Sequence, residues 1–487
     1  MAPGTWFMAG PAALHAAAAL RRAPDLVVPN PAEDWRLARI DVVVHANRDQ
    51  ATIVHCLASL LRQTSPPRRV LLVDDGGAER DHGSQLAREF ARANGLELRV
   101  IQRKWSIGKA ATLKRQAREF TGDVMLVIDA DTVLQSPRYI EQCIYRLYEG
   151  AGIASACGLL EPLRPADRKR QSGWPAFRNW LAGDDFVDPL SGGDFLQKGW
   201  QAWGDLCGAH VARLQQGLLE RGAMVRHGGI PVPSGGAIAW RRRYLKDLFD
   251  RYEPVRGDNL TAMEDHFIGL ALATEGYRNI RLRHVRARVQ CPGPERLPVA
   301  AWRETIAQLQ GAHYFDALLR TPFRNLRNRW PDWWAARRGQ LPERHRWEEQ
   351  RKVREAYRQP FGEWLTHRSG RPIGTTLLLL AFERVAWPTL LAVLAILGQW
   401  WALTVLVAVE TGMTLAATAW VAPQHPWRAV LDGLLSTPLR YLALMTSLPA
   451  MLWFGLRLWS RRDFQWHAQR AAEGPPRPAA RRRRKRL

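Results

Sequence analysis

The chain has 487 residues, of which 46% are hydrophobic and 9% aromatic, and this composition excludes an unfolded chain. Its 70 Lys and Arg residues exceed its 46 Asp and Glu residues, so the formal net charge of +24 points to an anionic partner. The five cysteines include no C-x-x-C pair, so neither a zinc site nor a disulfide framework is indicated, and reduced thiols are expected.

The N-terminal segment, residues 1–37, begins with a weakly apolar stretch that ends at Leu20. Gly4, Pro11 and His15 interrupt this stretch, and no basic region precedes it. We therefore expect an interfacial helix here rather than a signal peptide.

Short apolar runs and helical patterns alternate from residue 41 to residue 128. This strand–helix–strand order predicts right-handed crossovers in a parallel sheet. The run 124–128 is the most apolar, so it is expected near the centre of the sheet. The expected strands are 41–44, 70–73, 96–101 and 124–128, and the expected helices are 51–63 and 109–120.

Carboxylates stand just after two of these strands. Asp74 and Asp75 follow one strand, and Asp129 and Asp131 follow the other. Ligands of open α/β sheets bind outside the carboxyl ends of the strands, so these side chains should share one rim. A pair of carboxylates can bind a Mg²⁺ or Mn²⁺ ion that also contacts a diphosphate. For each motif taken alone, the alternative is an ordinary charged turn.

Two further motifs are candidates for catalysis and for nucleotide binding. Glu264 and Asp265 open a helical pattern, where a carboxylate suits a general base, although the helix dipole alone would also favour acidic residues there. The turn 106–109 resembles a phosphate-binding turn but lacks the G-x-x-x-x-G-K-S/T pattern. Lys109 could contact a nucleotide, and an ordinary surface lysine is the alternative.

The rest of the chain before the apolar region is less regular. Residues 165–230 mix Trp with Gly, Asp and Pro, and we expect an irregular loop-and-helix insertion over the site. The turn 233–236 leads into a strand at 237–240. Residues 298–372 are expected to form amphipathic, Arg- and Trp-rich helices in the membrane interface.

The C-terminal region is apolar enough to span a membrane. Glu410 is the single charged residue in 385–422, which is about twice the ~20 residues that cross a bilayer, and 438–458 would be a further span. Glu383 and Arg384 are expected to interrupt another candidate at 373–387. We therefore expect two to four spans, with a buried soluble core as the alternative.

Basic residues flank these spans. The run 481–486 follows them, and Arg-rich stretches at 324–338 and 344–358 precede them. This distribution favours anionic membrane lipid over nucleic acid, so no nucleic-acid partner is expected, and merely solvated arginines are the alternative. Three spans would place the basic tail outside, whereas the positive-inside rule places it in the cytoplasm.

The order and spacing of these motifs resemble family 2 glycosyltransferases of the membrane-bound, inverting type. That family includes the synthases of hyaluronan, cellulose, chitin oligomers and poly-N-acetylglucosamine, and glycolipid-forming relatives. The resemblance covers roughly residues 38–310. It rests on the blocks 42–76, 108–113, 129–131, 234–237 and 264–265.

The resemblance implies a GT-A fold, an α/β domain with a mixed, mostly parallel sheet and flanking helices, followed by C-terminal transmembrane helices. The implied site residues are Ala46, Asp75, Lys109 and Asp129 for the nucleotide sugar, Asp131 for Mg²⁺ or Mn²⁺, Asp265 as the catalytic base, and Ser234, Gly235, Gly236 and Glu264 on the acceptor side. The implied domains are 1–37, a catalytic domain at 38–297, interfacial helices at 298–372, transmembrane helices at 373–460 and a basic cytoplasmic tail at 461–487.

Three departures from the family pattern stand out. His45 replaces the usual proline, and Lys114 replaces the usual asparagine. The Gln-x-x-Arg-Trp signature of processive members is not intact, because 326–330 and 343–347 keep Arg-Trp but carry Leu and Glu in place of Gln. Processive polymerisation is therefore not predicted.

The expected function is a glycosyltransferase of the inner membrane with a cytoplasmic site. It would move a sugar from a nucleotide-diphosphate donor, with UDP-linked sugars expected, to a glycan or lipid acceptor. One alternative is transfer of a single sugar to polyprenyl phosphate. A general base is less necessary for that reaction, because the acceptor is already anionic. Another is a non-catalytic membrane or nucleic-acid binding protein with a degenerate fold.

Overall fold

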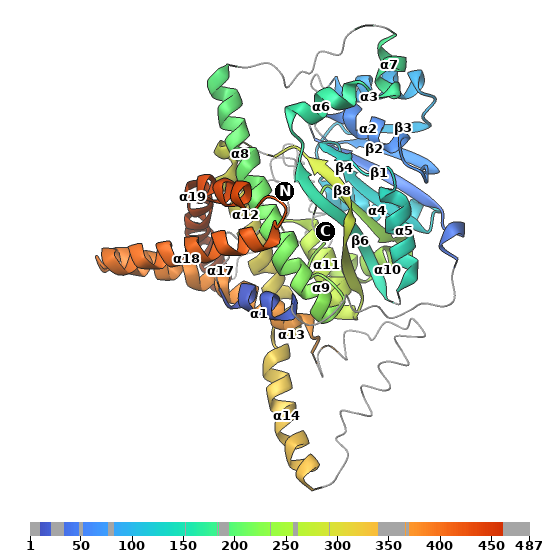
Figure 1. Cartoon of the computed structure of the whole chain (residues 1–487). Coiled ribbons are helices and arrows are strands. Elements are labelled where there is room, and N and C mark those ends of the chain that lie inside the picture. The colour runs from blue at the N-terminus through green and yellow to red at the C-terminus, as the bar shows by residue number, and fades with distance from the viewer. Residues whose placement is uncertain are drawn as a thin grey trace, which may run out of the picture.

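A mixed sheet with helices on both faces forms one side of the molecule, and three long apolar helices form the other (Figure 1). The predicted α/β class with C-terminal apolar helices is therefore confirmed. The computed structural model describes residues 10–20, 34–47, 52–75, 82–150, 152–182, 184, 194–233, 235–256, 262–291, 293–338, 366 and 370–460.

The sheet has eight strands in the order β3-β2-β1-β4-β7-β6-β8-β5. Their bounds are β1 Ile40–Ala46, β2 Arg69–Asp74, β3 Leu98–Gln102, β4 Val124–Asp129, β5 Thr132–Leu134, β6 Ile153–Pro162, β7 Ala237–Arg241 and β8 Arg278–Val289. The pairs β1–β2, β1–β4, β2–β3 and β6–β8 are parallel, whereas β4–β7, β6–β7 and β5–β8 are antiparallel. All the predicted strands are present, with ends that shift by one or two residues.

The central strands are apolar because helices cover both of their faces. In β4 the residues Val124–Ile128 are buried, and in β1 only His45 is partly exposed. Continuous apolar runs of this kind are typical of strands that are buried on both sides. The most apolar run therefore lies inside the sheet, between β1 and β7, as predicted.

The order in which strands are added to the sheet changes direction at β1. It passes outward from β1 through β2 to β3, and then returns to place β4 on the other side of β1. Right-handed crossovers then put α2 (Ile53–Leu61) and α3 (Gly83–Ala93) on one face and α4 (Lys109–Glu119) on the other. The carboxyl ends of β1 and β4 thus form a topological switch point, where open α/β sheets bind ligands.

Tyr139 ties the neighbouring strands β6 and β7 together. It is the first residue of α5 (Tyr139–Glu149) and is fully buried. Its hydroxyl donates a hydrogen bond to the carbonyl of Ala237 at 2.8 Å and accepts one from the N–H of Gly158, also at 2.8 Å. The phenol therefore bridges the middle of β6 and the start of β7 and fixes how the antiparallel strand enters the sheet.

The insertion at 165–230 is more helical than predicted. Its described part forms α6 (Pro165–Ser172), α7 (Pro175–Leu181), α8 (Phe195–Leu214), the π-helix η2 (Gln215–Glu220) and α9 (Arg221–His227). Helix α8 packs along α18 (Trp400–Val421) and α19 (Pro426–Trp459). For example, Trp203 donates an indole hydrogen bond to the carbonyl of Leu435 at 2.8 Å. Part of the insertion therefore supports the apolar helices.

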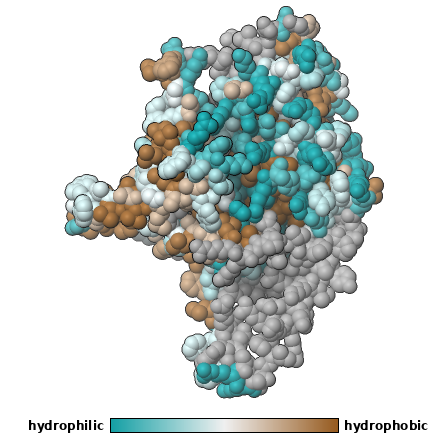
Figure 2. Space-filling view, in the orientation of Figure 1, coloured by the Kyte–Doolittle hydropathy of each residue, from teal (hydrophilic) through white to brown (hydrophobic). Residues whose placement is uncertain are grey.

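Three described helices are long and apolar enough to cross a membrane: α17 (Ile373–Ile396), α18 and α19. Figure 2 shows that hydrophobic side chains gather where these helices project from an otherwise mostly hydrophilic surface. Their number lies within the predicted range of two to four. The interfacial position of residues 298–372 and the domain boundaries stay predictions.

Glu383 and Arg384 do not interrupt α17, so that expectation is wrong. Glu383 accepts a hydrogen bond from the N–H of Ala12, in the first turn of α1 (Pro11–Leu20). Arg384 donates to Glu304 of α12 (Leu297–Tyr314) at 2.7 Å. Each charged side chain is paired at a helix contact inside the protein, so neither faces hydrocarbon alone and the helix continues through both.

Glu410, the charged residue in the middle of α18, is paired in the same way. It accepts hydrogen bonds from Arg440 and Tyr441 of α19 and from Thr414 one turn further along α18. Both Glu410 and Arg440 are almost fully buried. The ion pair therefore ties α18 to α19 inside the apolar bundle, where an isolated carboxylate would be costly.

Candidate functional site

The switch point gathers the strand ends that carry the predicted carboxylates. The N–H of Asp75 donates to the carbonyl of Ala46 at 2.8 Å, which joins the ends of β2 and β1. The N–H of Ala130 donates to the carbonyl of His45 at 2.9 Å, which joins the ends of β4 and β1. Asp75 and Asp129 therefore share one rim, as the strand pattern predicted.

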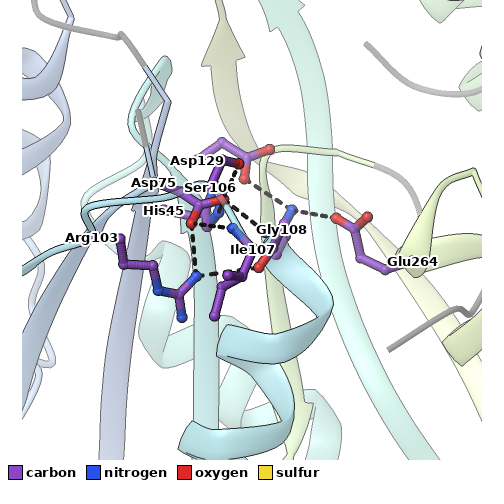
Figure 3. Close-up of polar contacts among 9 residues, drawn as sticks. His45, Asp75, Arg103, Ser106, Ile107, Gly108, Asp129 and Glu264 are labelled. Atoms are coloured by element: carbon purple, nitrogen blue, oxygen red, sulfur yellow. Dashed lines mark hydrogen bonds and ion pairs between the residues drawn. The ribbon is translucent and has the colours of Figure 1, made fainter. Parts of the chain in front are cut away.

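Asp75 is enclosed by the loop that precedes α4 (Figure 3). Its Oδ1 accepts hydrogen bonds from Arg103 Nη1 at 2.9 Å and from the N–H of Ile107 at 3.1 Å. Its Oδ2 accepts from Ser106 Oγ at 2.7 Å and from the N–H of Gly108 at 2.9 Å. A carboxylate has about four lone-pair positions, so all of them are used in this conformation.

These four donors keep Asp75 ionised. Burial raises the pKa of its carboxyl group, but the hydrogen bonds from Arg103, Ser106 and the two backbone N–H groups lower it below its usual value. The turn 106–109 is thus an anion-binding turn, and the anion that it holds here is the protein's own carboxylate. Contact between Asp75 and a nucleoside stays a prediction, and it requires one of these donors to move aside.

Lys109 connects the two halves of the candidate site. Its Nζ lies 2.9 Å from Asp129 Oδ1, 3.5 Å from Glu264 Oε1 and 3.8 Å from Asp265 Oδ2 (Figure 3 shows the first two contacts). Burial lowers the pKa of Lys109, but the three carboxylates raise it well above its ordinary value. A permanently charged ammonium group therefore links the end of β4 to the first turn of α11 (Glu264–Glu275).

Asp265 is a carboxyl group adapted to take up a proton near neutral pH. Burial, with smaller contributions from the charges of Glu264 and Asp129, raises the pKa of Asp265 to about 7, against the opposing effect of Lys109. Its Oδ1 is buried without a hydrogen-bond partner. An ionisable group that is tuned to the working pH and has an unused oxygen matches what a general base requires.

Asp131 lies two residues beyond the end of β4. Its Oδ1 accepts a hydrogen bond from Thr132 Oγ1 at 3.0 Å, and its carbonyl accepts one from the N–H of Gln290 at 3.2 Å. In the described part of the chain, no group of three or more His, Cys, Asp and Glu side chains is arranged to hold a metal. One or two carboxylates that leave other positions to phosphate oxygens still fit Mg²⁺ or Mn²⁺.

The charge balance of the rim also fits a divalent cation. Asp129, Glu264 and Asp265 surround the single ammonium group of Lys109, and Asp131 adds a further carboxylate nearby in the chain. A diphosphate brought to this rim would meet an excess of negative charge. A bound cation would offset that repulsion.

The glycines predicted on the acceptor side pack tightly against β5 and β6, and one of them bonds to the end of β4. The carbonyl of Gly236 accepts a hydrogen bond from the N–H of Asp129 at 2.6 Å. A Cβ atom on Gly236 would lie 1.8 Å from Thr132 Oγ1, and one on Gly235, which has a φ of 129°, would lie 2.5 Å from Leu160 Cδ1. Only glycine fits this close approach. Ser234 lies outside the described residues.

His45 is a further polar residue of this rim that the sequence motifs did not predict as a site residue. Its side chain is 12% exposed, and its Nε2 lies 4.0 Å from Asp75 Oδ2 without any hydrogen-bond partner. Burial lowers the pKa of His45 and outweighs the opposing charges of Asp129 and Asp75, so the ring is neutral at pH 7. The signal in the sequence was the replacement of the family's usual proline by a residue with hydrogen-bonding capacity.

Lys114, the second departure from the family pattern, lies away from this rim. Its Nζ lies 3.0 Å from Glu253 Oε1, and this contact joins α4 to α10 (Arg242–Arg256). The residue is almost fully buried. Its visible role is therefore to hold α10 against α4.

Comparisons with known proteins indicate the family to which the domain is similar. Residues 42–249 match the family model described as Glycosyl transferase family 2. An N-acetylglucosaminyltransferase of Bradyrhizobium diazoefficiens is 25% identical over 243 residues, which cover 49% of this chain and 42% of the relative. An N-acetylglucosaminyltransferase of Bradyrhizobium sp. (strain ANU 289) is 35% identical over 100 residues, which cover 20% of this chain and 64% of the relative.

The chain spans about half the length of the first curated relatives, 42% and 50% of them. Among solved structures, a mannosyltransferase from Pyrobaculum calidifontis in complex with GDP-Man and Mn²⁺ is 18% identical, and the alignment covers 93% of this chain and 95% of that chain with a TM-score of 0.46.

Proposed function

Because residues 42–249 form a family 2 glycosyltransferase domain, we propose that this chain transfers a sugar from a nucleotide-diphosphate donor to a glycan or lipid acceptor at a membrane, with inversion at the anomeric carbon. The observation that carries the proposal is the Lys109 cluster, which brings the donor-side Asp129 and the base-side Asp265 to one ammonium group. The curated relatives are N-acetylglucosaminyltransferases, so UDP-N-acetylglucosamine is the first donor to test.

The donor lies across the carboxyl ends of β1 and β4. Ala46 and His45 border the nucleoside, and Asp75 with its loop forms the neighbouring wall. Asp129 faces the ribose or the diphosphate, and Lys109 supplies positive charge beside it. A divalent cation held by Asp131 would neutralise the diphosphate as it leaves. These residues would hold the reacting bond in place, which is a large part of what such a site contributes.

The reaction then needs one proton transfer. Asp265 removes the proton from the acceptor hydroxyl as that oxygen attacks the anomeric carbon. The bond between the anomeric carbon and the phosphate oxygen breaks, and the nucleoside diphosphate leaves with the bonding electron pair. The proton remains on Asp265, whose pKa of about 7 allows it to be returned to solvent.

The placement of the domain follows from the apolar helices. We propose that α17, α18 and α19 cross the inner membrane and hold the catalytic domain at its cytoplasmic face, with the basic flanks on anionic lipid. The acceptor side, at Gly235, Gly236 and Glu264, would then receive an acceptor from the membrane surface. Processive chain growth is not part of the proposal.

The test is nucleotide release by the detergent-purified chain from a panel of UDP-, GDP- and dTDP-sugars. We expect release from a UDP-sugar in the presence of Mn²⁺ or Mg²⁺, and its loss when EDTA removes the metal. Adding the metal back in excess should restore release. If no donor is turned over even with membrane lipid extract as acceptor, the proposed activity is wrong.

Replacing His45 with alanine should weaken binding of the donor nucleotide. A net hydrogen bond contributes about 0.5–1.5 kcal/mol, so we expect the Kd for UDP to rise by up to roughly tenfold. Isothermal titration calorimetry with UDP measures this directly. His284→Ala is the matched control, because His284 contacts Gln142 and is exposed. An unchanged Kd in His45→Ala would exclude His45 from the nucleotide contact.

A further inference from the structure

A cavity of about 70 Å³ lies between α11, α12 and α17, at the junction of the catalytic domain and the apolar helices. Part of its wall comes from η2 and from the loop that leads to the acceptor-side glycines. The lining residues include Glu220, Val232, His266, Leu377, Leu380 and Ala381.

The cavity has a polar part and an apolar part. Its polar groups are neutral or already paired. His266 is 3% exposed, and its Nε2 has no hydrogen-bond partner. Burial, with a smaller effect of Arg384, lowers the pKa of His266 to about 3, so the ring is uncharged. Glu220 accepts hydrogen bonds from Arg281 at 2.7 Å and 3.1 Å, which balances its charge. The cavity therefore suits an uncharged segment of a ligand.

The apolar part of the wall belongs to the first apolar helix. Leu377, Leu380 and Ala381 follow one another at helical spacing on one face of α17. On the same helix Phe382 and Val385 are 58% and 41% exposed, as side chains that face a bilayer would be. One wall of the cavity is therefore a helix that we place in the membrane.

The polar part of the cavity includes the residue that follows the proposed base in sequence. His266 follows Asp265 directly in the first turn of α11. Pro231 and Val232 belong to the loop that continues into Gly235 and Gly236, and Val232 and Pro233 approach Gly269 of α11 so closely that a Cβ there would lie 2.5 Å from Pro233 Cδ. The cavity is therefore lined on one side by α17 and on the other by residues that neighbour the acceptor-side residues in the chain.

We infer that this cavity holds a hydrocarbon chain of a lipid acceptor, close to the end that carries the reacting group. This inference rests on the proposed function and narrows its acceptor to a lipid. A sugar carries hydroxyl groups on most of its carbons, and burying them against leucine side chains would leave them unpaired. A hydrocarbon chain meets no such cost, and the Nε2 of His266 can bond an uncharged oxygen near the head of the chain.

The inference can be tested with the full chain in lipid nanodiscs. Two photoreactive probes, each with a diazirine in its hydrocarbon chain, distinguish the sources of the chain: one is an isoprenyl phosphate and the other an acyl-chain phospholipid. We expect one probe to label peptides of α12 or α17 that line the cavity. Ala381→Trp fills the cavity and should lower this labelling at least tenfold, and Ala312→Leu is the milder filling variant.

Val385→Trp is the matched control, because it adds the same side chain to the exposed face of α17. It should leave labelling unchanged. In enzyme assays Ala381→Trp should raise the KM for the lipid acceptor about tenfold while nucleotide release to water keeps its wild-type rate. This split separates a filled acceptor cavity from general damage to the fold, which would lower both.

Three results of labelling and competition would overturn the inference, as would an unchanged lipid KM in Ala381→Trp. Labelling could fall outside the cavity with both probes, labelling could persist in both filling variants, or a water-soluble glycan could compete fully with the lipid as acceptor. These results are separate from failure of the proposed function. If wild-type protein releases no nucleotide from any donor, the proposed activity is rejected, whereas normal release with an unchanged lipid KM in Ala381→Trp rejects the cavity alone.

Discussion

Replacing Asp265 with asparagine is expected to lower the rate of transfer by about 10²–10⁴-fold, the usual contribution of a general base. Asparagine keeps the size of the side chain but cannot take up the proton of the acceptor hydroxyl. Asp265 has a buried oxygen without a partner and lies beside Lys109, so no other group of the described cluster is equally placed to accept that proton. Steady-state transfer with saturating donor and metal measures the loss.

The pH dependence of transfer should report the same group. The pKa of Asp265 is raised to about 7, so below that pH the carboxyl group is protonated and cannot act as a base. Activity should therefore rise as the pH increases through about 7 and level off above it. The profile of kcat/KM reports the free enzyme, which is the state described here. In Asp265→Asn this rise should be absent.

Glu264→Gln is the matched control for Asp265→Asn. Glu264 also contacts Lys109, at 3.5 Å, but it lies on the acceptor side in our proposal and is not the base. We expect it to keep at least about a tenth of the wild-type rate and a rise of activity with pH. That rise should lie at a somewhat lower pH, because the charge of Glu264 contributes to the raised pKa of Asp265. Near-normal turnover by Asp265→Asn would reject Asp265 as the general base. That result would favour transfer to an acceptor that is already anionic, such as polyprenyl phosphate.

The strands and the shared rim could be predicted because their signals are local. Unbroken apolar runs such as 124–128 mark strands that are buried on both faces, and a carboxylate at the end of each run falls at the same edge of a parallel sheet. The predicted meeting of Asp75 and Asp129 at the switch point follows from this alone. It needs no knowledge of side-chain partners.

The partners themselves could not be predicted, because they come from distant parts of the chain. Nothing near Asp75 in the sequence shows that Arg103 and Ser106 will occupy its oxygens. From the sequence, the charge of Arg384 is incompatible with an apolar helix. In the fold, Arg384 is paired with Glu304, which lies far away in the chain. A local pattern identifies the side chain that needs a partner, whereas only the fold identifies the partner.

The same limit applies to the cavity. Leu377, Leu380 and Leu270 are ordinary apolar residues of helices, and nothing in their spacing distinguishes a packed contact from an open space. The space arises where η2, α11, α12 and α17 meet, and a π-helix such as η2 is a frequent local irregularity at functional sites. A hollow between several helices depends on how all of them pack, so it is invisible in any one of them.

Replacing Asp131 with alanine is expected to lower metal-dependent nucleotide release by about a thousandfold. A metal ion contributes several kcal/mol to the stabilisation of charge in such a transition state, and about 1.4 kcal/mol corresponds to a tenfold change in rate. Asp131→Asn keeps one oxygen ligand, so it should instead raise the Mn²⁺ concentration that gives half-maximal release. Titrating Mn²⁺ against the rate of release separates the two variants.

The comparison with Asp123→Ala decides whether the effect belongs to the metal site. Asp123 lies just before β4, at the opposite end of that strand from Asp131. There it accepts a hydrogen bond from the N–H of Arg39 at 3.0 Å. Removing it takes away a carboxylate beside β4 without touching the switch point, so release and its Mn²⁺ dependence should stay at the wild-type level. If Asp131→Ala keeps wild-type release at limiting Mn²⁺, the cation is held elsewhere. The excess of negative charge around Lys109 would then have to be balanced by the donor's own counterions.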